Sequence, residues 1–350
     1  MKIVIAIDSF KGSATSIELG QAAKAGILEV QPDAQVKVFE IADGGEGTVS
    51  ALKQVLQGKM IKVKTIDLLR RPIIAEYFLA GDKAFIETAS VIGIDKISPT
   101  PETIEKATTI GLAALIIDAT ICGAKKIYLT LGGSGTSDGG LGLLEGLGVS
   151  LNNFSFNSKF PKLIGLADVN NPYSGPEGYA QFFGTQKGAT EEILNKQDAQ
   201  AEKIVRKVKE KLNIDLQSIP GTGAAGGLGA AIVILGGRIE AGFPRIVEFL
   251  KIEEELTNTD LVITGEGRMD KQTINGKVPW GMVLLAEKYQ VPVIALCGAI
   301  SDDLGKIEDH LVGAYSIQTR PISLEKAIEK VRTLENMKRL SKNIIKTWLA

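Results

Sequence analysis

Residues 125–143 read KKIYLTLGGSGTSDGGLGL, a short apolar run followed by a segment dominated by glycine. The apolar run is typical of a β-strand, and residues 140–147 have the pattern of a helix. A strand that passes through a turn into a helix is the repeating unit of α/β proteins. Glycine also lets the backbone approach a ligand closely, because it has no Cβ. The stretch therefore predicts an α/β fold with a ligand-binding loop.

Three other predicted strands end in similar turns. IVIAI leads into DSFKGS (8–13), FEI leads into ADGGEGT (42–48), and LVIT leads into GEGRMD (265–270). Ligands of open α/β sheets bind beyond the carboxyl ends of the strands. We therefore expect these turns to carry the chemistry.

The remaining pattern predicts α/β structure over the whole chain. The expected strands are 3–8, 35–43, 125–131, 260–265, 291–298 and 312–317. The expected helices are 16–30, 102–121, 140–147, 190–212, 244–256, 279–289 and 323–348. The first helix has Thr15 or Ser16 as its N-cap.

The two ends of the chain alternate strands and helices, whereas the middle is more irregular. Strand-like pieces occupy residues 60–90, and residues 150–190 are rich in Asn, Pro and Gly and predict ordered loops with strands. A length of 350 residues also favours two domains. We expect a doubly wound parallel-sheet domain from residues 1–68 and 256–350, with a second α/β domain inserted at 69–255.

Composition argues against several classes of protein. The chain has 40 basic and 41 acidic residues, which gives no electrostatic case for binding nucleic acid or an anionic membrane. It has no apolar run near the roughly 18 residues that a membrane helix needs, and the N-terminal apolar run is too short for a signal peptide. The two cysteines, Cys122 and Cys297, suit a reducing compartment. We expect a cytoplasmic protein.

The single histidine, His310, lies in a polar context typical of a partly exposed helix. Chemistry based on histidine bases or histidine-bound metals is therefore nearly excluded. Any catalysis must therefore use carboxylates, Lys, Arg, hydroxyls or backbone groups. If a metal takes part, oxygen ligands favour Mg²⁺ or Mn²⁺.

The segment GGSGTSDGG (132–140), called the glycine loop below, has the composition of a phosphate site. Successive N–H groups in such a turn attract anions, and Ser134, Thr136 and Ser137 add hydroxyl donors. Asp138 would hold a Mg²⁺ that in turn contacts the phosphate. The alternative is a tight strand–helix turn capped by the aspartate.

Charged residues gather in the same kinds of turn. The acidic ones are Asp8, Asp43, Glu46, Asp138, Asp168, Glu266 and Asp270, and the basic ones are Lys11, Lys187, Arg268 and Lys277. Each could be a cap or a surface charge. Together they favour phosphoryl transfer, which depends on charge neutralisation and positioning.

Two nucleotide-binding motifs give little support. The Walker A pattern is absent, and GTGAAGG (221–227) follows Pro220 instead of a clear strand. A dinucleotide site there needs a preceding strand. The following GLGAAIVILGG predicts a helix that packs closely through its small residues.

Six segments together resemble the bacterial type-I glycerate kinases. They are DSFKGSATS, IADGGEGT, TLGGSGTSDGGLG, ADVNNPYSGPEGYAQFFGTQKGAT, GTGAAGGLGA and DLVITGEGRMDKQTINGKVPWG, in order from residue 3 to about 300. Gly135 and Ser137 depart from the family's usual GGSATNDGG. The Cys that often precedes Asp168 is missing, and Thr185 stands where Pro is common.

This resemblance implies transfer of the γ-phosphoryl group of ATP, with Mg²⁺, to a hydroxyl of D-glycerate. It favours 2-phosphoglycerate over 3-phosphoglycerate as the product. It also implies a Rossmann-like domain of both termini, an inserted α/β domain, and an active-site cleft between them.

We assign roles in this reaction to individual residues as hypotheses. The catalytic candidates are Asp43, Asp8 and Lys11, with Asp43 ahead of Asp8 because two glycines follow it. The substrate-binding candidates are Ser9, Lys11, Arg71 and Arg268. The nucleotide- and phosphate-binding candidates are Gly132, Gly133, Ser134, Thr136, Ser137 and Lys187. The metal-binding candidates are Asp138, Asp168 and Asp270.

Three alternatives stay open: a non-catalytic nucleotide sensor, a kinase of a related small hydroxy acid, and a dehydrogenase that binds NAD at GTGAAGG. The sequence does not indicate an oligomeric state.

Overall fold

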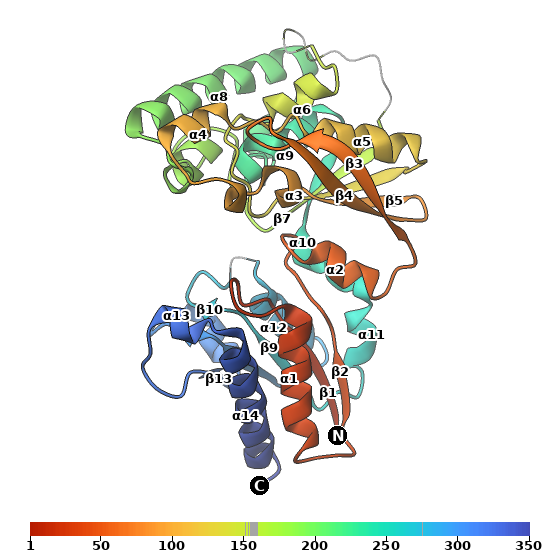
Figure 1. Cartoon of the computed structure of the whole chain (residues 1–350), viewed down its shortest axis with the longest axis vertical. Helices are drawn as coiled ribbons and strands as arrows, with labels where there is room; N and C mark the ends of the chain where they lie inside the picture. Colours follow the sequence, from red (N-terminus) through yellow and green to blue (C-terminus); the bar gives the residue numbers. More distant parts are fainter. Residues whose placement is uncertain (151, 153, 155–159, 275) are drawn as a thin grey trace. The chain divides into compact units, whose positions relative to one another are not determined.

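The computed structural model describes residues 1–150, 152, 154, 160–274 and 276–350. The chain forms two compact units, the first from Met1–Asp43, Ser50–Val55 and Phe243–Ala350 and the second from Gly44–Val49 and Leu56–Gly242. Each unit combines helices with a sheet (Figure 1). The predicted α/β class, with one domain built from both termini, is confirmed.

The unit boundaries differ from the predicted ones. The strand β3 (Lys59–Ile66) pairs with β4 (Pro72–Ala80) in the sheet of the second unit. It therefore belongs to the second unit, whereas the sequence placed the boundary after it, at residue 68. The helix α10 (Gly242–Leu250) supplies Phe243 and Ile246 to a core of the first unit, so the chain returns near residue 243 instead of 256.

A five-stranded parallel sheet forms the centre of the first unit, in the order β13–β11–β9–β1–β2. Its strands are β1 (Lys2–Ile7), β2 (Gln35–Val38), β9 (Leu261–Gly265), β11 (Val293–Cys297) and β13 (Gly313–Ser316). Along β1, Ile3 and Ile5 belong to one buried cluster, and Val4 and Ala6 belong to another. Both faces of the sheet are therefore covered, as parallel sheets require.

Helices α1 (Ser16–Leu28) and α14 (Lys330–Trp348) lie side by side and cover one face of this sheet (Figure 1). Gly26 permits their close approach, because a Cβ there would lie 2.0 Å from the carbonyl oxygen of Lys338. Thr15 caps α1 as predicted. The other face is covered by α10 and by α12 (Val278–Glu287).

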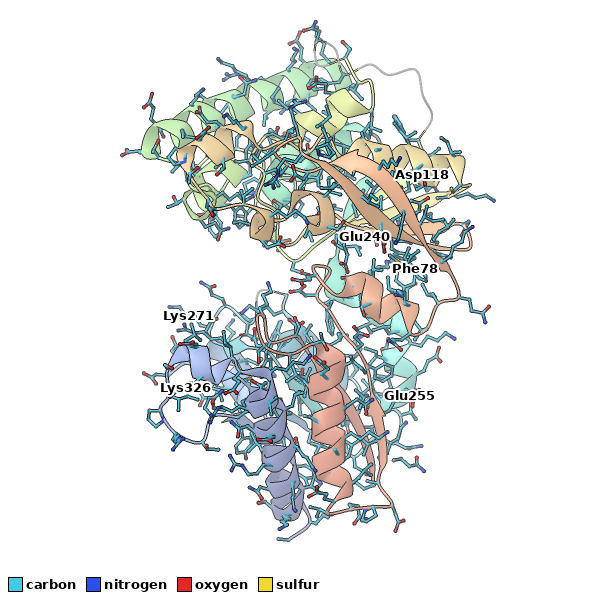
Figure 2. All side chains as sticks on the ribbon, viewed as in Figure 1. Phe78, Asp118, Glu240, Glu255, Lys271 and Lys326 are labelled. Atoms are coloured by element: carbon cyan, nitrogen blue, oxygen red, sulfur yellow. The ribbon has the colours of Figure 1, made fainter. Side chains whose placement is uncertain are left out.

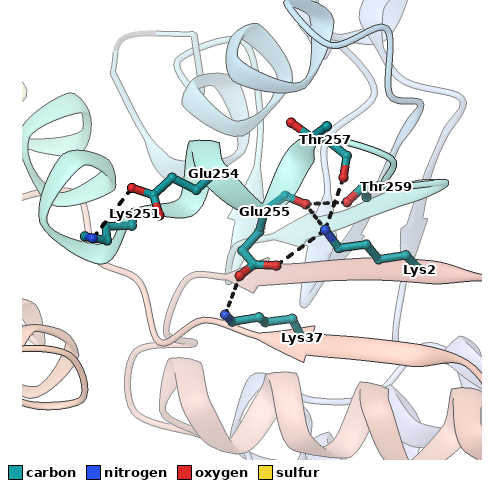
Figure 3. Close-up of polar contacts among 7 residues, drawn as sticks. All are labelled: Lys2, Lys37, Lys251, Glu254, Glu255, Thr257 and Thr259. Carbon is teal, nitrogen blue, oxygen red and sulfur yellow. Dashed lines mark hydrogen bonds and ion pairs between the residues drawn. The ribbon is translucent and has the colours of Figure 1, made fainter.

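Polar contacts join the start of β1 to residues 255–257, in the segment where the chain re-enters the first unit (Figure 3). Lys2 Nζ donates hydrogen bonds to the carbonyl oxygens of Glu255, at 2.6 Å, and Thr257, at 3.2 Å. Lys37 Nζ pairs with the Glu255 carboxylate at 2.6 Å. Exposed ion pairs contribute only about 0–1 kcal/mol, so these contacts mainly position the helix α11 (Ile252–Leu256).

The second unit contains a six-stranded sheet in the order β3–β4–β5–β6–β7–β8. Its remaining strands are β5 (Lys83–Glu87), β6 (Lys126–Thr130), β7 (Lys162–Ala167) and β8 (Arg238–Ala241). Strands β5 to β8 pair in parallel, whereas β3, β4 and β5 form an antiparallel meander. The principal helices are α4 (Pro101–Lys106), α5 (Leu112–Ile121), α6 (Leu141–Gly146), α7 (Tyr179–Phe183), α8 (Glu191–Leu212) and α9 (Ala224–Ile234).

Several predicted elements are shorter than expected. The predicted helix 102–121 is two helices, α4 and α5, separated by a segment that includes Thr109. The predicted helix 244–256 breaks at Lys251, which has a left-handed backbone with φ of 54°. The predicted strand 35–43 ends at Val38, and β8 was not predicted. Part of the predicted loop region 150–190 lies outside the described residues.

Candidate functional site

One group of predicted residues lies at the carboxyl ends of β1 and β9, within the first unit. Asp8 follows β1, and its N–H donates to the carbonyl oxygen of Gly265 at 2.9 Å. The Ser9 N–H donates to Asp8 Oδ1 at 2.7 Å. Because β1 and β9 are parallel neighbours, the turns DSFKGS and GEGRMD start at the same edge of the sheet.

Asp8 has an unusual electrostatic environment. Burial, and then the nearby carboxylate of Asp43, raise the pKa of Asp8 to about 7. The Ser9 N–H and the positive charge of Lys11 oppose this rise, and Glu266 adds to it. The structure thus brings Asp8, Asp43 and Lys11 together. A neighbouring negative charge disfavours ionisation of a carboxyl group, so Asp8 can take up or release a proton near neutral pH.

Glu266 supports this edge from the turn after β9. Its side chain is buried and accepts hydrogen bonds from Thr273 Oγ1 at 2.5 Å and Lys277 Nζ at 2.9 Å. Burial raises the pKa of Glu266, and these two donors oppose the rise. Sequence reasoning marked Glu266 only as a turn acid and overlooked Thr273. The signal for Glu266 was its place directly after a strand without polar residues other than Thr264.

Arg268 and Asp270 lie farther along the same loop, which Lys271 marks in Figure 2. Arg268 is exposed in the short strand β10 (Arg268–Met269), which pairs with β12 (Ala299–Ile300). Asp270 accepts the N–H of Gln272 at 2.9 Å and so closes a local turn.

The second group is the glycine loop between β6 and α6, within the second unit. The Gly135 N–H donates to the Ile92 carbonyl oxygen at 2.7 Å, and the Ile94 N–H donates to that of Gly133 at 2.9 Å. Gly132 lies against Gly45 of the turn ADGGEGT, where a Cβ would be 3.0 Å from the Gly45 Cα. The loop is therefore held in one shape by backbone contacts on two sides.

Lys187 is a buried residue that donates hydrogen bonds to the same loop. Its side chain is buried, and Nζ donates to Ser134 Oγ at 3.1 Å and to the Thr136 carbonyl oxygen at 2.7 Å. Burial lowers the pKa of Lys187 to about 8, and the negative charge of Asp138 opposes this shift. These contacts make Lys187 a part of the loop's scaffold.

The carboxylate of Asp138 is occupied by protein donors. Oδ2 accepts from the N–H of Thr109 at 2.7 Å, the hydroxyl of Thr109 at 2.9 Å and the N–H of Gly142 at 3.2 Å. Oδ1 accepts from the N–H of Gly140 at 3.0 Å. Burial raises the pKa of Asp138 and these hydrogen bonds oppose the rise. This arrangement favours a structural role for Asp138 over the predicted metal role.

The other predicted ligands belong to different units. Asp168 follows β7 in the second unit, whereas Asp270 belongs to the first unit. Among the described residues, no group of three or more His, Cys, Asp or Glu side chains is arranged to hold a metal ion. Arg71 pairs with Asp67 at 2.6 Å and also donates to the carbonyl oxygen of Lys96 at 3.0 Å.

The GTGAAGG segment packs against the glycine loop. Ala225, Gly226 and Gly227 all have positive φ, at 53°, 66° and 91°. A Cβ on Gly226 would lie 2.0 Å from the Thr136 carbonyl oxygen, and the Gly139 N–H donates to the Gly226 carbonyl oxygen at 2.9 Å. Close packing therefore accounts for these glycines without a dinucleotide.

Comparison with known proteins identifies the family of this chain. The model of the glycerate kinase family matches residues 3–159 and 150–349. The chain belongs to the glycerate kinase family. It is therefore a kinase that transfers a phosphoryl group to a hydroxyl group.

Individual relatives match over nearly the full length. The chain is 36% identical to glycerate 2-kinase of Escherichia coli over 374 residues, covering 99% of this chain and 98% of that protein. It is 36% identical to glycerate kinase of Bacillus cereus over 375 residues, with the same coverage. A crystal structure from Salmonella typhimurium LT2, provisionally named glycerate kinase 2, has a TM-score of 0.83 at 33% identity and covers 100% of this chain and 98% of that one.

Within the described part of the chain, no helix has the length and apolar character that a membrane crossing requires.

Proposed function

We propose that this chain is a glycerate kinase that uses ATP and Mg²⁺ to phosphorylate D-glycerate at its 2-hydroxyl. The names of the relatives above support the acceptor, and the Escherichia coli name supports the 2-position. The observation that carries the mechanism is the carboxylate of Asp8, whose pKa is raised to about 7 beside Asp43 and Lys11. A base works best when its pKa lies near the working pH.

Asp8 is the group that we assign as the base, ahead of Asp43. As the acceptor oxygen bonds to the γ-phosphorus, the hydroxyl proton passes to the Asp8 carboxylate and the bond to the ADP leaving group breaks. Lys11 is exposed on the same turn and offers a cation for the carboxylate of glycerate. Ser9 and the exposed Arg268 lie at the same edge of the sheet and are further candidates for the acceptor.

The glycine loop is the group that we assign to the phosphates of the donor. Gly132, Gly133 and Ser134 begin the loop one residue after the end of β6, where backbone N–H groups favour anions. Thr136 Oγ1 is buried and has no hydrogen-bond partner among the described residues, so the loop carries an unused hydroxyl donor. Lys187 acts through its two loop contacts as a positioning residue.

We assign Mg²⁺ to a carboxylate of the first unit instead of to Asp138, which accepts four hydrogen bonds from protein donors. Mg²⁺ is usually held by one or two carboxylates, with waters and phosphate oxygens completing the shell. Asp43, whose negative charge acts on Asp8, is the carboxylate that we assign to this role. When bound, Mg²⁺ supplies charge neutralisation on the transferring phosphates.

The direct test measures ADP release from Mg·ATP with and without D-glycerate, with phosphorus NMR of the product. Glycerate-dependent release and 2-phosphoglycerate are expected. The same assay on Asp8→Asn excludes a contaminating ATPase, because this variant should lose the glycerate-dependent rate. Release with D-lactate or glycolate but not with glycerate would indicate a related hydroxy acid, and ATP binding without release would indicate a sensor.

A further inference from the structure

A pocket of about 220 Å³ lies within the second unit and is not used by the mechanism above. Its walls come from α4, from α8 and from the end of the glycine loop. Buried apolar side chains line part of it: Ile104, Ala107, Ile204, Tyr173 and Tyr179. Ser137 and Asp138 line it where it meets the loop.

A hydrogen bond joins the glycine loop to α8, which forms one wall of the pocket. Ser137 Oγ donates to Gln197 Oε1 at 2.7 Å and so joins the loop to α8. At the rim, Lys196 Nζ and Glu105 Oε1 form an ion pair at 2.8 Å that joins α8 to α4. Gln200 is exposed at the rim and makes no hydrogen bond to any described residue.

We propose that this pocket binds the nucleoside end of the phosphoryl donor. This proposal rests on the proposed function, and it assigns the part of the donor that the glycine loop does not hold. The pocket begins at Ser137, the last hydroxyl of that loop. A nucleotide whose phosphates lie along the loop would therefore extend its base and ribose towards α4 and α8.

The lining chemistry suits a flat, uncharged heteroaromatic group. Apolar and aromatic walls bury a ring, and a primary amide such as that of Gln200 pairs with a base edge that has both a donor and an acceptor. Drug-sized ligands occupy pockets of roughly 300–1,000 Å³. A volume of about 220 Å³ therefore fits part of a nucleotide better than all of it.

The phosphates of the donor and the carboxylate of the acceptor fit this pocket poorly. A phosphate inside the pocket would face the carboxylate of Asp138. The carboxylate of a small hydroxy acid would need a free cation, but Lys196 is already paired with Glu105. The neutral nucleoside avoids both conflicts.

The test measures ADP binding by isothermal titration calorimetry in the full chain and in three variants. Gln200→Trp and Glu105→Trp fill the rim from α8 and from α4. Lys203→Trp places the same ring at another exposed position on α8, outside the pocket lining. The first two variants should weaken ADP binding at least tenfold, and Lys203→Trp should leave it unchanged. Inorganic tripolyphosphate, which lacks a nucleoside, should bind all four proteins alike.

The first two outcomes below separate a failure of this proposal from a failure of the proposed function. Unchanged ADP affinity in both rim variants, while the wild type phosphorylates D-glycerate, would overturn the pocket assignment and leave the kinase intact. Weakened ADP binding in an enzyme that ignores D-glycerate would support the pocket and overturn the acceptor. No ADP binding by the wild type would overturn both.

Discussion

Asp8 and Asp138 look alike in the sequence but differ in their surroundings. Each follows a parallel strand near glycine and serine, and burial raises the pKa of each. Asp138 accepts four hydrogen bonds from protein donors, whereas Asp8 accepts one, from Ser9, among the described residues. Asp8 instead faces the charges of Asp43 and Lys11.

This comparison shows that the donors around a buried carboxylate decide its role. A fully hydrogen-bonded carboxylate organises its surroundings and has little capacity left for a ligand. A buried carboxylate placed between charges has a shifted pKa and is a candidate for catalysis. Substitutions at the two sites should therefore have opposite effects on activity and stability.

The largest expected effect is on turnover. Asp8→Asn should lower kcat at least about a hundredfold, because a positioned base contributes roughly 10²–10⁴ in rate. Steady-state kinetics of ADP release measures this, and Asp33→Asn, an exposed substitution in the same unit, serves as the control. A kcat for Asp8→Asn within a few-fold of wild type would remove Asp8 from the mechanism.

The same variant should not be less stable than wild type. The folded state binds the Asp8 proton more tightly than the unfolded chain, so ionised Asp8 lowers stability as the pH rises from about 4 to about 7. Above this range, Asp8→Asn should have a Tm equal to or higher than that of wild type. A clearly lower Tm would mean that Asp8, like Asp138, has a structural role.

Asp138→Ala should act mainly on stability. It leaves the N–H groups of Thr109, Gly140 and Gly142 without their acceptor. Each unsatisfied buried group costs about 1–3 kcal/mol, so we expect a loss of about 3 kcal/mol in the free energy of unfolding. Urea denaturation measures the loss. Stability equal to wild type would contradict the structural role.

Gly226→Ala should loosen the packing of GTGAAGG against the glycine loop. The new Cβ would lie 2.0 Å from the Thr136 carbonyl oxygen. Gly148→Ala is the matched control, because its φ of 75° is similar but its Cβ would meet nothing within 4 Å. Left-handed backbone alone costs about 1–2 kcal/mol for alanine. Gly226→Ala should lose more than the control by urea denaturation, and equal losses would contradict the packing account.

Much of the fold could be predicted from the sequence. The strands β1, β9 and β11 of the first sheet are short, mainly apolar runs, and the alternation of strands and helices indicated a parallel sheet. The turns after β1, β6 and β9 were found in the same way, since glycine and charged residues follow directly after apolar residues.

The remaining features depend on long-range contacts. The break between α4 and α5 allows Thr109 to hydrogen-bond to Asp138, which is 29 residues away in the sequence. Helical periodicity reflects local spacing only, so it could not predict this contact. The sequence also could not show that Asp138 is fully hydrogen-bonded, or that Asp43 raises the pKa of Asp8.

The central claim is that a proton on Asp8, tuned by Asp43 and Lys11, controls the reaction. The most direct test is the pH dependence of kcat/KM for wild type, Asp43→Asn and Lys11→Ala. In wild type, kcat/KM should fall about tenfold per pH unit below a pKa near 7. Asp43→Asn should move this limb to lower pH and Lys11→Ala to higher pH, because they remove charges of opposite sign. A limb that stays at the same pH in both variants would contradict the account.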